Sequence, residues 1–294
     1  MSLARKHAVV TLADYRSYVV DGWRLRALPD RWTRALQEQV LLAVRAQTVA
    51  RHPQTVSLSS EIDGVTQQFF LKIFHRRHVS ALVKDRLRHS PAQCFWRQGI
   101  ALSKAGFDVP LTIAVGSAGR LRIAKREFVV SENIAGVPMP IFLHGNNGAE
   151  VVIPLRKWQS VRRLARLVQR FHQLGFVHGD LVASNIFLSV ENNDEVKFYF
   201  MDNDRTRRYP SWFGKSLRKR NLVQLNRLPL PGISLQDRMR FLHAYLDEEN
   251  LSARGRQLAR WLEAKTRIRR QEVDGADPNM NFRKLMQWFP QAAR

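Results

Sequence analysis

The chain has 294 residues, of which 45% are hydrophobic, so it is long and apolar enough to form one large or two modest domains with proper cores. Its 48 Lys and Arg residues against 25 Asp and Glu residues give a net charge of +23. This excess predicts an anionic partner, whether nucleic acid, anionic lipid or a phosphorylated glycan, with general solubility as the alternative explanation.

The cysteine content and the distribution of apolar residues indicate the compartment. The single cysteine, Cys94, excludes an intramolecular disulfide framework and is typical of a reducing compartment. The first fifteen residues contain no apolar signal segment, and no window offers the ~18 uncharged apolar residues that a membrane span requires. We therefore expect a cytoplasmic protein that is soluble or peripheral to a membrane.

The first part of the chain predicts a helix followed by two strands. Residues 33–47 carry apolar side chains at helical spacing. Residues 55–74 then follow a β pattern, with an Asp-Gly turn in the middle. Lys72 lies between two apolar residues of the second strand and therefore points to the opposite face from both. That face is either the solvent side of a half-buried strand or the place of a functional lysine.

A second helix and two more strands come next. We expect the helix over 92–104 and the strands over 110–115 and 121–130, joined by a glycine-containing turn at 116–119. Together these elements form a small sheet with one helix. A polar segment with a glycine follows, so we place a boundary between two lobes near Glu132.

Beyond this boundary the sequence becomes mostly helical. The clearest helix covers 158–174, where apolar residues face one side and most arginines the other. Further helices are expected over 216–228, 234–246, 251–268 and 282–289, with a loop at 271–281. The predicted fold class is therefore α+β, with a small β-rich lobe followed by a mostly helical lobe.

A hairpin interrupts these helices. Residues 186–188 form a short strand, 191–194 carry turn residues, and 196–201 are rich in β-forming residues. Because the two open ends of an antiparallel hairpin are neighbours, Asp180 and Asn185 at its entrance should lie near Asp202 at its exit.

The three side chains at these hairpin ends offer carboxylate and amide oxygens. Such oxygens are the ligands that Mg²⁺ prefers, and Mg²⁺ usually keeps substrate phosphates and waters in its remaining positions. Asp180, Asn185 and Asp202 therefore predict a metal-assisted phosphoryl-transfer site.

The same segment resembles a known motif. Four residues match the protein-kinase catalytic loop H-R-D-L-x-x-x-N at its spacing, with Gly in place of the usual Arg: His178, Asp180, Leu181 and Asn185. More narrowly, the chain resembles the lipopolysaccharide core kinases, which phosphorylate heptose or 3-deoxy-D-manno-octulosonic acid (Kdo) of the inner core. The segments that carry this resemblance are FFLKIF, KAGFDVPLTIAVG, VVSENIAG, LVQRFHQLGFVHGDLVASNIFL, FYFMDNDRTRR and RNLVQLNRLPLPGISLQDRMRFLHAYL, from about residue 68 to 246. HGDL and DNDR look closer to the Kdo kinase branch.

The resemblance implies a two-lobed protein-kinase-like fold and a role for each matching residue. Residues 1–50 would be an N-terminal helical extension of the small lobe, 51–132 the N-lobe and 133–294 the C-lobe. Asp180 would accept or orient the acceptor hydroxyl, and Asn185 and Asp202 would hold Mg²⁺. Lys72 would contact the phosphates of ATP, and Glu132 would lie in the nucleotide site. His178 is expected to support the loop structurally.

Several positions depart from the kinase pattern. The helix over 92–104 should supply a glutamate to pair with Lys72, yet Phe95 occupies the best-aligned position and no acidic residue lies between Asp85 and Asp108. Lys72 would therefore lack its usual partner, unless a glutamine of this helix orients it. Asn203 and Asp204 replace the usual Phe-Gly after the metal aspartate, no complete glycine-rich loop precedes Lys72, and Asn221 stands where many members carry Asp.

A basic run with interleaved aromatic residues follows the site. Arg205, Arg207 and Arg208 are candidates for binding the acceptor, and further basic residues extend to position 220. The run suits the phosphate and carboxylate groups of lipid A-core, with Trp212 and its aromatic neighbours at the surface of an anionic membrane. A solvated helix face beside core aromatics is the structural alternative, and nucleic acid is not excluded, because its phosphates would use the same side chains.

These observations lead to one leading hypothesis, an ATP- and Mg²⁺-dependent sugar kinase that phosphorylates Kdo or heptose of the lipopolysaccharide inner core. It would act at the cytosolic membrane face, peripheral to the inner membrane. The alternatives are a catalytically impaired regulatory or binding protein, suggested by the missing glutamate, and a kinase-fold nucleic-acid binder. A small aminoglycoside-like or protein acceptor conflicts with the basic surface.

Overall fold

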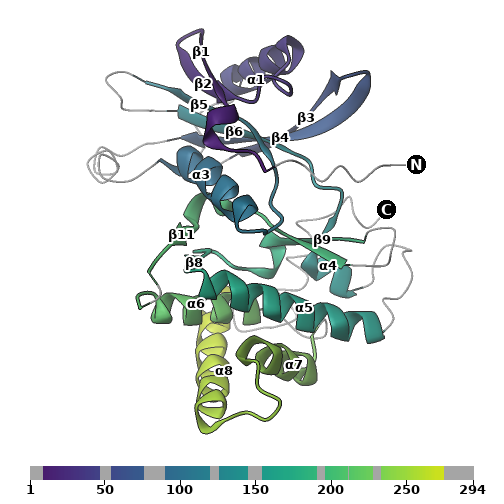
Figure 1. Cartoon of the computed structure of the whole chain (residues 1–294), viewed down its shortest axis with the longest axis vertical. Helices are drawn as coiled ribbons and strands as arrows, with labels where there is room; N and C mark the ends of the chain where they lie inside the picture. Colours follow the sequence, from purple (N-terminus) through teal and green to yellow (C-terminus); the bar gives the residue numbers. More distant parts are fainter. Residues whose placement is uncertain are drawn as a thin grey trace. The chain divides into compact units, whose positions relative to one another are not determined.

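The computed structural model of the chain describes residues 9–46, 54–75, 90–119, 126–144, 154–190, 196–210, 212–227 and 233–274. The elements form two compact units. The first comprises Met1–Ala135 and Phe200–Arg205, and the second Gly136–Tyr199 and Thr206–Arg294. The first unit is rich in strands and the second in helices (Figure 1), which confirms the predicted α+β class.

The first unit is built on a six-stranded sheet in the order β1-β2-β5-β6-β4-β3. Its strands are β1 (Arg16–Val20), β2 (Trp23–Ala27), β3 (Gln54–Ile62), β4 (Val65–His75), β5 (Thr112–Ala118) and β6 (Arg126–Glu132), and its helices are α1 (Arg34–Ala46) and α3 (Pro91–Lys104). Figure 1 shows α1 on one side of this sheet and α3 on the other. Both helices and the β3–β4 hairpin agree with the sequence prediction.

The β1–β2 hairpin is an element that the prediction of a helical extension missed. Its sequence signal is an Asp-Gly turn, with φ of 50° at Asp21 and 79° at Gly22. Trp23, Leu25 and Ala27 are buried while the two arginines between them are exposed, as expected of a strand with one face on the core. The hairpin extends the sheet by pairing β2 with β5.

The predicted turn at 116–119 was also wrong, because β5 continues through Gly116 to Ala118. A Cβ atom at Gly116 would lie 2.3 Å from the ring of Phe128 and 2.8 Å from Leu25. This glycine therefore permits close packing inside the sheet instead of turning the chain.

Strand β4 gives Lys72 its position. Leu71 and Ile73 are fully buried, whereas Lys72 points to the other face and pairs in register with Thr55 and Val129 of the flanking strands. Lys72 is thus on a central strand of the sheet, where its backbone is fixed from both sides.

The second unit has two small sheets and five helices within its described residues. Its strands are β7 (Val137–Pro138), β8 (Phe176–Val177), β9 (Ile186–Val190), β10 (Val196–Phe200) and β11 (Arg207–Arg208), in the orders β10-β9-β7 and β11-β8. Its helices are α4 (Met139–His144), α5 (Pro154–Gln173), α6 (Lys215–Asn226), α7 (Leu235–Leu246) and α8 (Ala253–Asp274). The pairing of β9 with β10 confirms the predicted hairpin; its turn at 191–194 lies outside the described residues.

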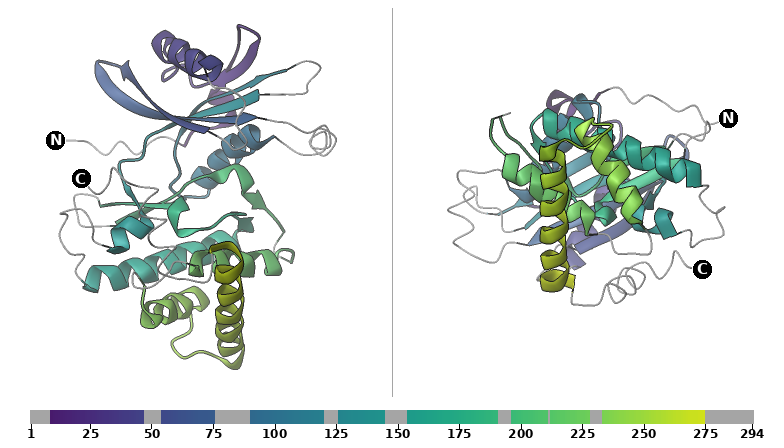
Figure 2. Two further views of the ribbon diagram at one scale, coloured as in Figure 1. Left: turned by 180° about the vertical axis from the view of Figure 1, so that it is seen from behind. Right: turned by 90° about the horizontal axis from the view of Figure 1, so that it is seen from below.

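Four helices of the second unit, α5 to α8, correspond to predicted helices, whereas α4 was not predicted. Helix α7 begins with a capping box, in which Ser234 and Asp237 bond to each other's backbone. Helix α8 runs to Asp274, past the predicted start of a loop at 271, and the helix predicted at 282–289 lies outside the described residues. Figure 2 shows α7 and α8 next to each other in this unit.

Candidate active site

In the first unit, Lys72 is held by two aspartates. Its ammonium group pairs with a carboxylate oxygen of Asp202 and lies 3.4 Å from Oδ2 of Asp204. The ammonium also lies 5.1 Å from the ring centre of Phe74, two residues along the same strand. Helix α3 supplies no acidic partner to Lys72, and the partners come instead from the segment after β10.

The segment that carries these aspartates is itself fixed to the first unit. The backbone N–H of Phe200 donates to the carbonyl of Asp108 at 3.0 Å, and the Phe200 ring meets that of Phe107 edge-on at 5.9 Å. The buried side chain of Asn203 donates to the carbonyl of Phe200 at 2.9 Å, which closes the turn. Asp202 lies within this turn with a φ of 55°, in the left-handed region.

The charges of this cluster affect one another. Burial and the negative charge of Asp202 raise the pKa of the Asp204 carboxyl, and the Lys72 ammonium opposes the rise. Asp202 is the more exposed of the two carboxylates, at 38% against 13%. Asp202 is therefore the better placed to meet a cation from solvent.

Glu132, the predicted nucleotide-site residue, lies at the end of β6. Its backbone N–H donates to the carbonyl of Leu111 at 2.9 Å, and its carboxylate is 3.4 Å from Nη1 of Arg31. The ion pair holds the side chain beside the sheet.

In the second unit, the loop that carries Asp180 is closed by its own backbone. The N–H of Val182 donates to the carbonyl of Asp180 at 2.9 Å, and Asn185 donates its side-chain Nδ2 to the same carbonyl at 3.0 Å. Gly179, with φ of 79°, makes the turn into the loop, which explains why glycine suits this position. Because the amide nitrogen of Asn185 is engaged, its amide oxygen is the atom that can ligate a cation.

Helix α6 anchors this loop through two amide side chains. The fully buried Asn221 accepts the backbone N–H of His178 at 3.0 Å and donates to Oε1 of Gln224 at 3.0 Å. Gln224 in turn accepts the N–H of Leu181 at 3.1 Å and donates to the carbonyl of Gly179 at 3.1 Å. The sequence had marked Asn221 only as a departure, and it gave no signal for Gln224.

The anchor continues to α5 and α7. Nε2 of His172 lies 3.3 Å from Oδ1 of Asn221, and its Nδ1 lies 2.8 Å from the hydroxyl of Tyr245. Burial lowers the pKa of His172 to about 4 and raises the pKa of Tyr245 to about 12. The neutral imidazole therefore donates from Nε2 to Asn221 and accepts at Nδ1 from Tyr245. His178 is fully buried.

The basic run divides between the two units. Arg205 is exposed at the end of the first unit. In the second, Arg207 donates to the carbonyl of Thr206, while Arg208 donates to the carbonyl of Leu174 at 3.1 Å and lies over the Phe176 ring. Part of the run therefore supports the local structure. Trp212 and Phe213 expose 77% and 47% of their surface.

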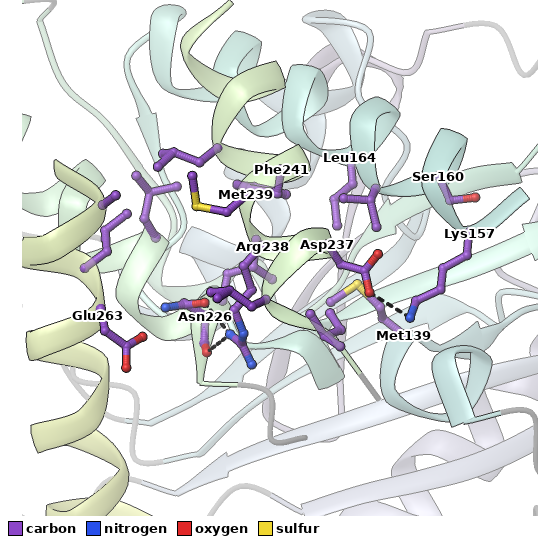
Figure 3. Close-up of a pocket in the computed structure, with 18 of the residues that line it drawn as sticks. Met139, Lys157, Ser160, Leu164, Asn226, Asp237, Arg238, Met239, Phe241 and Glu263 are labelled. Carbon is purple, nitrogen blue, oxygen red and sulfur yellow. Dashed lines mark hydrogen bonds and ion pairs between the residues drawn. The ribbon is translucent and has the colours of Figure 1, made fainter. Parts of the chain in front are cut away.

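The second unit also contains an apolar cavity of about 580 Å³ bounded by α4, α5, α6, α7, α8 and the β9–β10 hairpin. Its walls include Leu164, Phe198 and Met239, and charged side chains edge it. Figure 3 shows Lys157 meeting Asp237 at one side of this space and Arg238 meeting Asn226 at another. Nothing in the sequence patterns predicted this cavity.

The predicted site residues thus fall into two sets that the structure assembles separately. Lys72, Asp202 and Asp204 form the set of the first unit, and Asp180 with Asn185 the set of the second. Among the described residues, no three His, Cys, Asp or Glu side chains gather into a metal site of their own. Taken singly, the carboxylate of Asp202 in the first unit and the amide oxygen of Asn185 in the second are ligands of the kind that Mg²⁺ prefers. No helix among the described residues combines the length and the apolar character that crossing a membrane would require.

A strand lysine paired with aspartates in a β-rich unit, and an Asp-Leu-x-x-x-Asn loop anchored in a helical unit, define a protein-kinase-like phosphotransferase. The fold agrees with a solved structure described as "WaaP in complex with acyl carrier protein", to which the chain is similar with a TM-score of 0.56 and 24% identity, covering 76% of this chain and 90% of that one. The sequence pattern of the lipopolysaccharide kinase (Kdo/WaaP) family matches residues 41–245, so the chain belongs to this family. It is a kinase of the lipopolysaccharide core that transfers a phosphoryl group to a sugar hydroxyl. No curated protein matches the chain.

Proposed function

We propose that this kinase transfers the γ-phosphoryl group of ATP to a hydroxyl of Kdo in the lipopolysaccharide inner core, with heptose as the alternative acceptor. The observation that carries the proposal is the loop around Asp180. Its hydrogen bonds use the backbone and the amide nitrogen of Asn185, so the Asp180 carboxylate and the Asn185 oxygen remain for chemistry. The Kdo branch is favoured by the sequence segments HGDL and DNDR.

The role of each residue follows from its chemistry. Asp180 orients the acceptor hydroxyl and accepts its proton as the new phosphate bond forms. Lys72 binds ATP phosphates, and Glu132 lies in the nucleotide site. Asn185 and Asp202 hold Mg²⁺, which when bound neutralises charge on the phosphates.

The acceptor is an anionic glycolipid, and the proposed place of reaction is the cytosolic face of the inner membrane. Exposed basic side chains near such a surface each contribute on the order of 1 kcal/mol, and amphipathic aromatic rings favour its interface. Arg205, Arg207 and Arg208 are proposed to meet phosphate or carboxylate groups of the acceptor, and Trp212 and Phe213 to enter the interface. A nucleic-acid partner would instead require that duplex or single strands displace the protein from anionic vesicles in a salt-sensitive way.

The direct test is transfer of labelled phosphate from ATP to purified lipid A-core that lacks the Kdo phosphate. We expect Mg²⁺-dependent labelling of Kdo by the wild-type chain and none by Asp180→Ala. Glu38→Gln is the matched control, because Glu38 lies in an exposed surface ion pair with Arg34. Nucleotide binding without turnover on any lipid A-core would instead favour the regulatory alternative.

A second partner is suggested by the cavity of the second unit. We propose that it accepts the fatty acyl chain of an acyl carrier protein, because its apolar walls and volume of about 580 Å³ suit an alkyl chain. The net charge of +23 would favour an acidic carrier. Arg260 is an exposed cationic side chain among the residues that line the cavity, where it could meet an anionic group of the carrier.

Filling the cavity tests this partner. Met239→Trp should abolish co-purification of acyl carrier protein, detected by mass spectrometry, while the protein remains folded. Ile268→Trp, which enlarges an exposed side chain away from the cavity walls, should leave co-purification unchanged. Equal carrier content in both variants, or none in the wild-type chain, would exclude the proposal.

A further inference from the structure

The position of the Lys72 ammonium has to be fixed by a negative charge, and helix α3 does not supply one. No acidic residue occurs between Asp85 and Asp108, and Phe95, at the expected glutamate position, is 6% exposed within the apolar core. A carboxylate at that position would be buried among apolar side chains. The counter-ion must therefore come from another element.

Asp204 has the geometry and burial expected of this counter-ion. Its Oδ2 lies 3.4 Å from the Lys72 ammonium, and the side chains of Asp204 and Lys72 are 13% and 18% exposed. Two such enclosed opposite charges stabilise each other. Asp202 contacts the same ammonium, but its greater exposure suits it to exchange partners when a cation arrives.

Helix α3 supports Asp204 by packing. It packs against η3 (Asn203–Arg205), the short 3-10 helix that carries Asp204. The residues just after α3 add the Phe107–Phe200 ring contact and the hydrogen bond from Phe200 to the Asp108 carbonyl. The helix thereby fixes the carboxylate without providing it.

We propose that Asp204 is the residue that positions Lys72, in the place that a helix glutamate occupies in protein kinases. The two aspartates then divide their work: Asp202 is released to Mg²⁺, and Asp204 keeps the ammonium directed at the ATP phosphates. The inference rests on the proposed nucleotide role of Lys72. It also explains how the chain can be an active kinase without the glutamate that the sequence lacks.

The test compares Asp204→Asn, Asp204→Glu and the surface control Glu38→Gln. Because the substitution removes a hydrogen bond between charged groups, we expect Asp204→Asn to lower kcat/KM for ATP by about 10- to 100-fold. The KM for the glycolipid acceptor and the melting temperature should change little. If the role of Asp204 were merely structural, both would change together with kcat/KM for ATP. Asp204→Glu should recover part of the activity, and Glu38→Gln should match the wild type. Wild-type kcat/KM in folded Asp204→Asn would overturn the proposal.

Two further measurements keep the test decisive. Labelling of Lys72 by an acyl-phosphate analogue of ATP needs no acceptor. It therefore reports on Asp204 even if the wild-type chain fails to phosphorylate lipid A-core. Such a failure would count only against the proposed acceptor. We expect slower labelling in Asp204→Asn than in the wild type, and equal rates would contradict the proposal. A crystal structure of the wild-type chain with ADP and Mg²⁺ serves where Asp204→Asn does not fold. It should retain the Lys72–Asp204 contact, and separation of the two groups would overturn the inference.

Discussion

The two units hold their reactive residues by opposite means. In the first, Lys72, Asp202 and Asp204 are held by charge, and the same charges would face ATP and Mg²⁺. In the second, the loop of Asp180 is held by neutral hydrogen bonds from Asn221 and Gln224 to its backbone.

This difference separates residues whose substitution affects chemistry from those whose substitution affects the fold. Removing a charge in the first unit removes a group that would also bind ATP or Mg²⁺. Changing the Asp180 carboxylate should leave its scaffold intact, whereas changing the scaffold should disturb the loop without removing a reacting group. The following substitutions test this separation.

The largest effect is expected for Asp180→Asn. This variant keeps the backbone carbonyl that closes the loop but removes the base, so kcat should fall about a thousand-fold, as is typical for loss of a general base. Phosphate transfer to lipid A-core and the melting temperature are measured together. An active variant, or one with a markedly lower melting temperature, would break the proposed separation of chemistry from scaffold.

Asn221→Ala should have the converse effect. It leaves the buried N–H of His178 and Nε2 of His172 without their acceptor, so the free energy of unfolding should fall by about 3 kcal/mol. Urea unfolding measures this loss, with the exposed Asn250→Ala as the matched control. Equal stability of the two variants would show that the amide anchor is not what holds the loop.

The pH dependence of stability should report His172. Its pKa is about 4 in the folded chain against 6.5 for an ordinary histidine, so the unfolded chain binds the proton more readily. The contribution of His172 to the free energy of unfolding is fully present above pH 6.5. It is lost as the pH falls toward 4, and the loss is at most about 3 kcal/mol. The groups facing it are Tyr245, Asn221 and, through its charge, Arg218. The unfolding free energy of His172→Phe should depend less steeply on pH in this range than that of the wild type. Identical pH dependence of the two proteins would refute a neutral His172 in the folded chain.

The smallest effect concerns Arg208. Its hydrogen bond to the Leu174 carbonyl and its position over the Phe176 ring predict that Arg208→Ala loses about 1 kcal/mol of unfolding free energy. Arg205→Ala, at an exposed position, should change stability by less than about 0.5 kcal/mol. Similar stabilities in chemical denaturation would show that Arg208 has no structural role.

Elements whose local signals agree with their packing could be predicted from sequence. The helices α1, α3, α5 and α7 and the two hairpins β3–β4 and β9–β10 have clear periodicity and turn residues. The β1–β2 hairpin also has an Asp-Gly turn and alternating buried and charged residues, but its pairing with β5 joins segments that are far apart in the sequence. Gly116 shows the limit of local signals, because a glycine needed for packing looks the same as one needed for a turn.

The sequence identifies candidate site residues where the spacing of a motif carries the chemistry. Asp180, Asn185 and Asp202 follow from the motif, and the structure adds how Asp180 and Asn185 are joined. The role of Asp204 was not predictable, because the sequence shows a missing glutamate but not which carboxylate the fold brings to Lys72 from 132 residues away. Gln224 and Tyr245 were missed for the same reason, since their partners are distant in sequence.

The most direct measurement is mass spectrometry of the lipopolysaccharide core from cells with this chain, without it, and with Asp180→Asn in its place. We expect one phosphate on an inner-core sugar to be present only with the wild-type chain. A phosphate count that is the same in all three would contradict it.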